Sequence, residues 1–183
     1  MAKGKKKKGG KGQAAAAADG ASAGGPDVFL SNYKMACKVL GIEEPSEQIT
    51  STFEKDSPPE ELCLADDLGP GGAHALTMAL LGSGAGMGGP YKALKSIRLW
   101  QCNIGPVGAG HVADFLRQAG DDQELCFLEF MNNKLGEAGC AKLGTMFSEG
   151  SGGRERLTHL FISLDRTIGN LGIKALSQVG AGS

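Results

Sequence analysis

The sequence predicts a mixed α/β fold in which short parallel strands form one layer and helices cover the other side. Three observations predict it. The apolar pattern L-x-x-L-x-L occurs in four segments, the first of them degenerate; a turn residue and a G-x-x-G pair follow each time; and apolar residues four apart come next. Leucines two apart share one face of a strand, whereas apolar residues four apart share one face of a helix. Each copy therefore predicts one strand followed by one helix.

The four copies share the form L-x-x-L-x-L-x-x-(N/C/D), then an aliphatic residue, glycine, two residues and glycine. The second and third copies match every position. The first has one residue fewer before its glycines, and the fourth inserts Arg166 and Thr167 after Asp165. The conserved order of these signals favours repeated units over a coincidence of glycines in an ordinary α/β domain. The copies span 62–72, 94–108, 125–139 and 157–172.

The residue after each strand is suited to a tight turn. Asn133 can bond the backbone of its own turn and of the neighbouring copy, and Cys102 and Asp165 stand at the same position in other copies. Glycine allows backbone angles that other residues avoid and lets adjacent copies approach closely. Turns and joins of this kind account for much of a glycine count of 30 in 183 residues, against an average usage of about 7%.

Residues 62–180 resemble the leucine-rich repeat family, and within it the ribonuclease-inhibitor-like subclass. The resemblance implies a leucine-rich repeat solenoid with short parallel strands on the concave side and helices on the convex side. It implies about four units within residues 61–183, and a concave strand face that binds other proteins. The copies are longer than the 20–29 residues usual for such repeats, and the excess falls in glycine-rich joins.

Residues 27–60 are predicted to form a helical cap over the first unit. Apolar residues recur at helical spacing through 29–41, and Gly41 ends that helix. Ser46 is suited to cap a second helix that runs to about Lys55. Similar short helical leaders occur in some intracellular and ciliary leucine-rich repeat proteins.

The fourth copy is not followed by a polar unit that would cover its outer face. A solenoid needs such a terminal cap. Two interpretations stay open at this point: the natural chain continues, or the face docks on another molecule.

Residues 1–26 are predicted to be a disordered basic tail. They contain no large apolar side chain after Met1, so burial cannot offset the entropy of ordering them. Its first 12 residues carry six lysines and no acid, whereas the rest of the chain has 13 basic and 20 acidic residues. Such a run binds anionic polymers, acts as a nuclear-import signal, or simply keeps the chain in solution. The lysines are Lys3, Lys5, Lys6, Lys7, Lys8 and Lys11.

The sequence shows no recognisable catalytic or metal-binding motif. No two of the five cysteines have the C-x-x-C spacing of a zinc site, and the three histidines stand singly. The glycine-rich stretch 82–89 lacks the Lys-Ser/Thr of a phosphate-binding loop. We therefore expect a protein that is not an enzyme and needs no metal or cofactor. No apolar run is long enough to span a membrane and no signal-peptide pattern is present, which favours a cytoplasmic protein with reduced thiols.

The residues between the leucines of each strand are predicted to face the concave side. Corresponding residues fall in rows across the strands, so Arg98, Glu129 and Phe161 form one row, and Trp100 and Met131 begin the next. Arginine and large apolar side chains of this kind are enriched in protein interfaces. The predicted partner-binding residues are Arg98, Trp100, Phe127, Glu129, Met131, His159 and Phe161.

These observations predict a protein–protein interaction scaffold within a larger assembly. The resemblance to ciliary repeat proteins and the lysine run, which is suited to the acidic tails of tubulin, suggest a ciliary axoneme. One alternative is a GTPase regulator, because ribonuclease-inhibitor-like repeats also occur in activators of Ran, although those carry a longer horseshoe and an acidic C-terminal region. The other is binding of RNA or another anionic polymer through the tail. The rest of the chain is acidic and would repel the phosphates of a nucleic acid.

Overall fold

The chain alternates strands and helices after an all-helical start. The structure is a computed structural model, and it describes residues 24–55, 57–119, 123–148 and 156–177. Within these ranges it has six helices and four strands. In chain order they are α1 (Pro26–Leu40), α2 (Glu47–Phe53), β1 (Glu61–Leu64), α3 (Gly69–Leu81), β2 (Ser96–Trp100), α4 (Gly105–Ala119), β3 (Phe127–Met131), α5 (Gly136–Ser148), β4 (His159–Ser163) and α6 (Gly169–Ser177).

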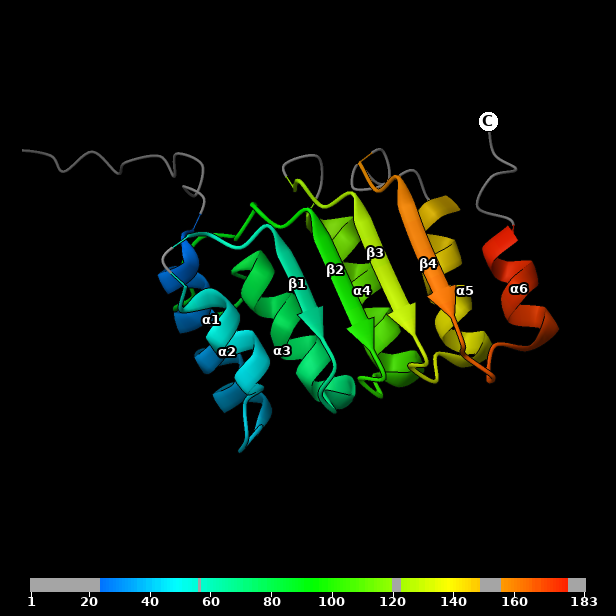
Figure 1. Ribbon diagram of the computed structural model, residues 1–183, viewed down its shortest axis with the longest axis horizontal. Helices are drawn as coiled ribbons and strands as arrows, with labels where there is room; N and C mark the ends of the chain where they lie inside the picture. The colour runs from blue at the N-terminus through cyan, green and yellow to red at the C-terminus, as the bar shows by residue number, and fades with distance from the viewer. Residues whose placement is uncertain (1–23, 56, 120–122, 149–155, 178–183) are drawn as a thin grey trace, which may run out of the picture.

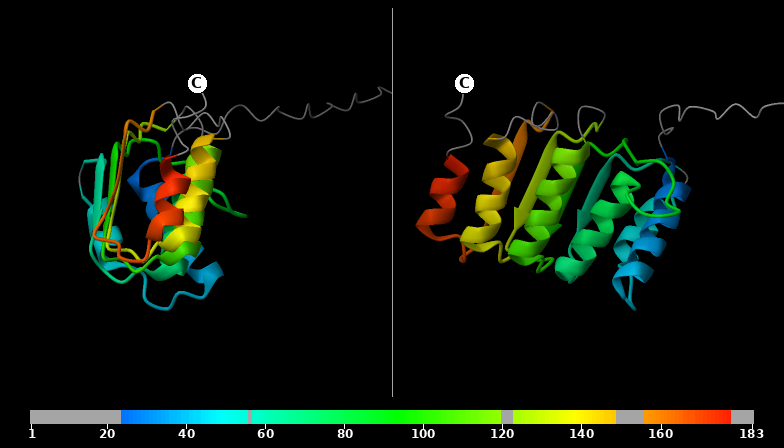
Figure 2. Two further views of the ribbon diagram at one scale, coloured as in Figure 1. Left: turned by 90° about the vertical axis from the view of Figure 1, so that its right-hand side faces the viewer. Right: turned by 180° about the vertical axis from the view of Figure 1, so that it is seen from behind.

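The four strands form one parallel sheet in the order β1-β2-β3-β4, so each strand lies beside the next strand of the chain. Figures 1 and 2 show two layers: α3, α4, α5 and α6 cover one face of the sheet, and none of the described helices lies over β2, β3 and β4 on the other. We call each strand with the helix after it a unit, which gives units β1–α3, β2–α4, β3–α5 and β4–α6. The predicted α/β class and parallel sheet are confirmed.

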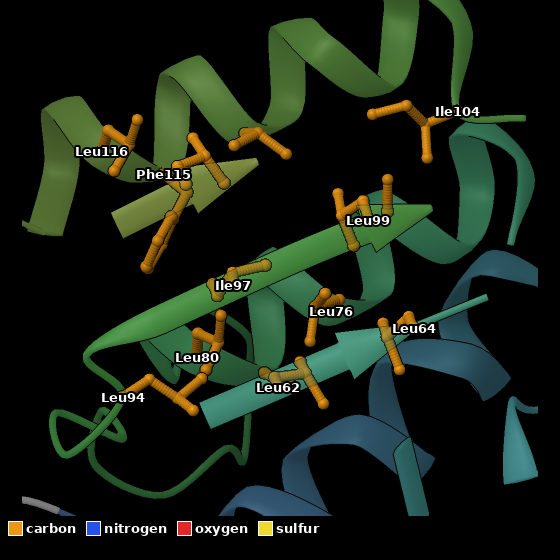
Figure 3. Close-up of a cluster of buried hydrophobic side chains, with 14 of the residues drawn as sticks. Leu62, Leu64, Leu76, Leu80, Leu94, Ile97, Leu99, Ile104, Phe115 and Leu116 are labelled. Atoms are coloured by element: carbon orange, nitrogen blue, oxygen red, sulfur yellow. The ribbon is translucent and has the colours of Figure 1, made fainter. Parts of the chain in front are cut away.

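Strand residues alternate between the helix layer and the opposite face, as the spacing of the leucines predicts. In β1 and β2 the inward residues are Leu62, Leu64, Ile97 and Leu99, and all four are buried. Figure 3 shows their side chains in the space between the strands and helices α3 and α4. A leucine or isoleucine buried in this way contributes roughly 1.5–3 kcal/mol, so this apolar layer holds the helices to the sheet.

Asn133 joins the turns of two neighbouring units, as predicted. Its side chain is buried, and its Oδ1 accepts a hydrogen bond of 3.1 Å from the Cys102 amide. Its Nδ2 donates to the carbonyls of Leu99, at 2.7 Å, and of Met131, at 3.1 Å. One unit earlier the Cys102 thiol makes the equivalent contact, donating to the Leu64 carbonyl over 3.3 Å. Cysteine therefore takes the place of asparagine as a small donor.

The fourth unit completes the turn before it in a different way. A carboxylate oxygen of Asp165 accepts a 2.6 Å hydrogen bond from the Leu135 amide, and the Thr167 hydroxyl accepts one of 2.9 Å from Gly136. In the two earlier turns a backbone carbonyl accepts the hydrogen bond from the corresponding glycine amide, as at Gly105. The inserted Thr167 therefore takes over a contact that the backbone makes elsewhere.

The two glycines of each G-x-x-G pair serve different purposes. The first has a φ between 56° and 62° in all four units, a region that other residues rarely adopt. The second lies close to the unit before it: a Cβ on Gly108 would lie 3.2 Å from that of Ala73, and one on Gly139 would lie 3.2 Å from that of Ala109. Both predicted reasons for glycine, unusual φ and close approach, are confirmed.

Helices α1 and α2 pack at the β1 end of the sheet (Figure 1). The ring of Phe53 stacks on Phe29 with centroids 3.7 Å apart and meets Tyr91, which precedes β2, edge-on at 5.0 Å. All three rings are buried. As predicted, Ser46 caps α2, and its side chain accepts a 3.2 Å hydrogen bond from the Ile49 amide. The helical start is thus packed against the first two units.

The predicted tail boundary needs a correction. Residues 24–26 are not part of a disordered tail, because the Gly24 amide donates a 2.8 Å hydrogen bond to the Pro90 carbonyl and α1 begins at Pro26. Proline has a φ suited to the first turn of a helix and lacks the amide that would be unpaired there. The helix therefore starts three residues before the predicted position. The rest of the predicted tail lies outside the described residues.

His74 of α3 and His111 of α4 stack on each other on the helix layer. Their ring centroids are 3.9 Å apart and their planes differ by 1°. Burial is the main cause that lowers the pKa of His111; His74 and Lys142 act in the same direction, and Asp114 opposes them. The folded protein therefore binds a proton at His111 less readily than the unfolded chain does.

We expect this histidine to make the protein less stable in acid. The contribution of the neutral His111 side chain to the free energy of unfolding is complete above the pKa of an unfolded histidine, about 6.5. It is lost as the pH falls from there through the lowered pKa of folded His111. Replacing His111 with glutamine should reduce the drop in the free energy of unfolding between about pH 7.5 and about pH 5.5, measured by urea denaturation. An equal drop in the variant and the natural protein would contradict this assignment.

Candidate interaction surface

All seven predicted binding residues lie on the sheet face opposite the helices, which we call the open face. Arg98 and Trp100 alternate with the buried Ile97 and Leu99 along β2, and the same alternation continues in β3. The residues of β4 are more exposed than those of its neighbour β3. The residues on the open face are Arg98, Trp100, Phe127, Glu129, Met131, His159 and Phe161.

The register of the sheet arranges these side chains in rows. Arg98 is paired with Glu129, and Glu129 with Phe161, while Trp100 is paired with Met131. Both rows agree with the rows predicted from the spacing of the copies. A third row consists of Glu61, Ser96, Phe127 and His159.

Arg98 stands at the centre of the open face between two carboxylates and an aromatic ring. Its guanidinium is 3.3 Å from a carboxylate oxygen of Glu61 and 3.8 Å from one of Glu129. The guanidinium carbon lies 4.8 Å from the centre of the Phe127 ring. Partly exposed ion pairs contribute about 0–1 kcal/mol each, so the main effect of these contacts is to hold the arginine in one orientation.

Three rings continue from Arg98 toward β4. Phe127 stacks with Phe161 at a centroid distance of 5.3 Å and with His159 at 5.9 Å. His159 and Phe161 also lie nearly parallel, with centroids 6.2 Å apart. Phe161 is 48% exposed. The arrangement therefore offers a pre-ordered aromatic surface at little cost in side-chain entropy, which favours binding of another protein.

Two polar groups of β2 on this face are without hydrogen-bond partners among the described residues. They are the Trp100 indole N–H and the Ser96 hydroxyl, both buried atoms. The register of the sheet places Ser96 in a row with Phe127 on the open face, but neighbouring side chains cover it so that only 5% of the residue is exposed. Buried groups left unpaired cost about 1–3 kcal/mol each, so β2 retains hydrogen-bonding capacity that the described part of the chain does not use.

Glu61 belongs to the open face but is absent from the predicted set. It opens β1 and pairs with Ser96 in the sheet, and its carboxylate approaches Arg98. The signal for it is its place directly before Leu62, since Ser96 stands directly before Ile97 in the same way. The degenerate first copy hides this correspondence, because it lacks the first leucine of the pattern.

The acidic residues of the chain are concentrated in the segment around Glu61. Residues 43–67 contain nine acidic residues and one basic residue. A polar cavity of about 740 Å³ lies in this region, between the α1–α2 turn and the β1–α3 turn, and its lining includes Glu47 and Asp66. The Ser46 hydroxyl donates a hydrogen bond to Asp66 there. The β1 end of the molecule therefore has a strongly acidic surface.

Three of the cysteines are buried protonated thiols. Burial is the main cause that raises the pKa of the Cys102 thiol to about 12, and it also raises the pKa values of Cys37 and Cys140. Within the described ranges, no group of three or more His, Cys, Asp or Glu side chains is placed to hold a metal ion. No helix in this part of the chain is long and apolar enough to cross a membrane. The six predicted polymer-binding lysines lie outside the described residues.

No family model matches the chain, and no curated protein matches its sequence. The open face is therefore the feature that points to a function. The binding role of its seven predicted residues stays a prediction.

Proposed function

We propose that this protein is a non-enzymatic interaction scaffold of the leucine-rich repeat type, which binds a partner protein through its open face. Support for the solenoid comes from the units, each of which adds one strand, one turn and one helix beside the last. The turns repeat the same hydrogen bonds from unit to unit, through Cys102, Asn133 and Asp165. The glycine pairs repeat as well.

The observation that carries the proposal is the cluster of Arg98, Phe127 and Phe161, with Trp100 on the same side of β2, on a face that none of the described helices covers. Such side chains supply most of the binding energy in protein interfaces, above all where they are already held in place. The acidic β1 end, with Glu61 at its border, favours a partner that presents basic side chains there. The axonemal setting stays a prediction from the resemblance and the lysine run.

Affinity purification from the native source tests this surface. We expect Trp100→Ala to reduce the recovery of the specific partner about 30-fold, because truncation of an interface anchor costs about 2 kcal/mol or more. A matched control is Val107→Ala, which changes an exposed apolar residue on the helix layer and should leave recovery unchanged. Circular dichroism and urea denaturation establish that both variants are folded.

Equal recovery of the same partners by folded Trp100→Ala and by the natural protein would contradict the proposal. Unfolding of Trp100→Ala would instead assign this residue to the core. In that case Arg98→Ala, which removes a partly exposed side chain, tests the same surface. Removing residues 1–12 in a parallel purification separates partners of the lysine run from partners of the open face.

A further inference from the structure

Flat side chains from three neighbouring strands stack across the open face. The guanidinium of Arg98 in β2 lies over the Phe127 ring of β3, with its carbon 4.8 Å from the ring centre. The Phe161 ring of β4 stacks with Phe127 at a centroid distance of 5.3 Å, and His159 lies nearly parallel to Phe161, with planes 8° apart. A cation therefore already lies at the β2 end of this stack, whereas Phe161 at the β4 end is 48% exposed.

The open face carries more negative than positive charge. With histidine counted as neutral, the charged residues in the described rows are Glu61, Arg98 and Glu129. The Arg98 guanidinium lies between the two carboxylates, and one positive charge balances only one of them. Lys95, just before β2, is paired with Glu60 at 2.8 Å, so it does not balance the second. The surplus carboxylate favours a partner that brings a positive charge to this face.

Glu129 is the carboxylate that Arg98 engages less. The guanidinium donates a 3.3 Å hydrogen bond to Glu61, but its approach to Glu129, at 3.8 Å, is too long for one. On its other side Glu129 is paired in the sheet with Phe161. The less engaged carboxylate thus lies beside the exposed ring at the β4 end. A carboxylate and an aromatic ring next to each other attract a cation by two separate effects, the negative charge and the electron-rich ring face.

Arg98 shows which kind of cation this surface accommodates. Its planar guanidinium lies over an aromatic ring and approaches carboxylates at the same time. Arginine can do both because its N–H groups lie in the plane that stacks, and so point sideways from the ring. The ammonium group of lysine is a compact point charge and cannot stack in this way. Phe161 and Glu129 offer the same two kinds of partner, a ring and a carboxylate, toward the β4 end.

We propose that the open face binds an arginine side chain of the partner protein at Phe161 and Glu129. The guanidinium stacks on the exposed Phe161 ring, and the Glu129 carboxylate accepts its N–H groups, which balances the surplus negative charge. Phe161 is already ordered by its stacking on Phe127, so little side-chain entropy is lost on binding. This inference rests on the proposed function, since it names the chemistry of the partner at the same face.

Titration of the full chain with Nα-acetyl-arginine amide, followed by NMR, tests this site. We expect the ring signals of Phe161, Phe127 and His159 to shift. Nα-acetyl-citrulline amide has nearly the same shape without the charge and should shift them far less, and Nα-acetyl-lysine amide should bind more weakly than the arginine compound. The proposal is overturned if these signals do not shift, or if the citrulline or lysine compound binds as well as the arginine compound.

Two variants locate the binding site. Phe161→Leu removes the ring but keeps an apolar side chain, and Glu129→Gln removes the charge but keeps the shape. Each should weaken binding of the arginine compound about two- to fivefold, the size of an exposed cation–π contact or ion pair. Glu43→Gln changes an exposed carboxylate between α1 and α2 and, as the matched control, should leave binding unchanged. Unchanged binding in either test variant, once circular dichroism shows it to be folded, overturns the site.

The titration and the purification with Trp100→Ala have separate outcomes. Loss of the partner by Trp100→Ala without binding of the arginine compound overturns the arginine site and leaves the scaffold function standing. Equal recovery of the partners by folded Trp100→Ala contradicts the scaffold function, whatever the titration shows.

Discussion

Replacing Asn133 with alanine is expected to lower the free energy of unfolding by about 3–5 kcal/mol, because each buried polar group left unpaired costs about 1–3 kcal/mol. The side chain is buried and makes three hydrogen bonds to backbone groups, two of them in the preceding unit. Alanine satisfies none of these groups. The Cys102 amide and the Leu99 carbonyl both lose this partner.

Urea denaturation followed by circular dichroism measures this loss. Asn170→Ala is the matched control, because Asn170 is exposed on α6 and its replacement should change the free energy of unfolding by less than about 0.5 kcal/mol. A loss below about 1 kcal/mol for Asn133→Ala would show that water replaces the lost contacts and that the turns do not depend on the side chain.

Phe53→Ala is expected to destabilise the whole protein by about 3–5 kcal/mol, the usual cost of removing a buried phenylalanine ring. Phe53 is buried between Phe29 of α1 and Tyr91, which lies three residues before the second repeat segment. The Tyr91 hydroxyl also donates a 2.8 Å hydrogen bond to the Pro59 carbonyl. The cavity left by the ring would therefore weaken the cap and the first two units together.

Thermal unfolding monitored by calorimetry and by far-ultraviolet circular dichroism measures the effect of Phe53→Ala. We expect one transition, shifted to lower temperature, because the cap and the units share this core. Val39→Ala serves as the control, since it shortens an exposed apolar side chain of α1. Two separate transitions in the Phe53 variant would show that the cap unfolds independently of the sheet.

Much of the fold follows from local patterns in the sequence. The period of two in Ile97 and Leu99 predicts which side of β2 is buried, and the G-x-x-G pairs predict where each helix begins. The start of α1 could not be predicted as well. Residues 24–26 look like the tail in composition, but the Gly24 amide bonds to Pro90, a contact that depends on residues distant in the chain.

The sequence predicts which residues of the open face share a row, but it does not predict the burial or the ion pairs of their side chains. The same spacing of apolar residues within each copy aligns Arg98, Glu129 and Phe161, because parallel pairing brings equivalent residues of neighbouring strands together. Spacing does not determine how far neighbouring side chains cover one another, so the burial of Ser96 was not foreseen. The ion pair from Glu61 depends on the conformations of two long side chains and is likewise beyond the pattern.

Side-chain hydrogen bonds join each turn to the turn before it: Cys102 to Leu64, Asn133 to Leu99, and Asp165 to the amide of Leu135. Each bond has one partner in either unit, so loss of one unit leaves unpaired groups in the units on both sides of it. Buried groups left unpaired are costly. The units therefore stabilise one another as neighbours, and loss of order at one of them spreads in both directions along the molecule.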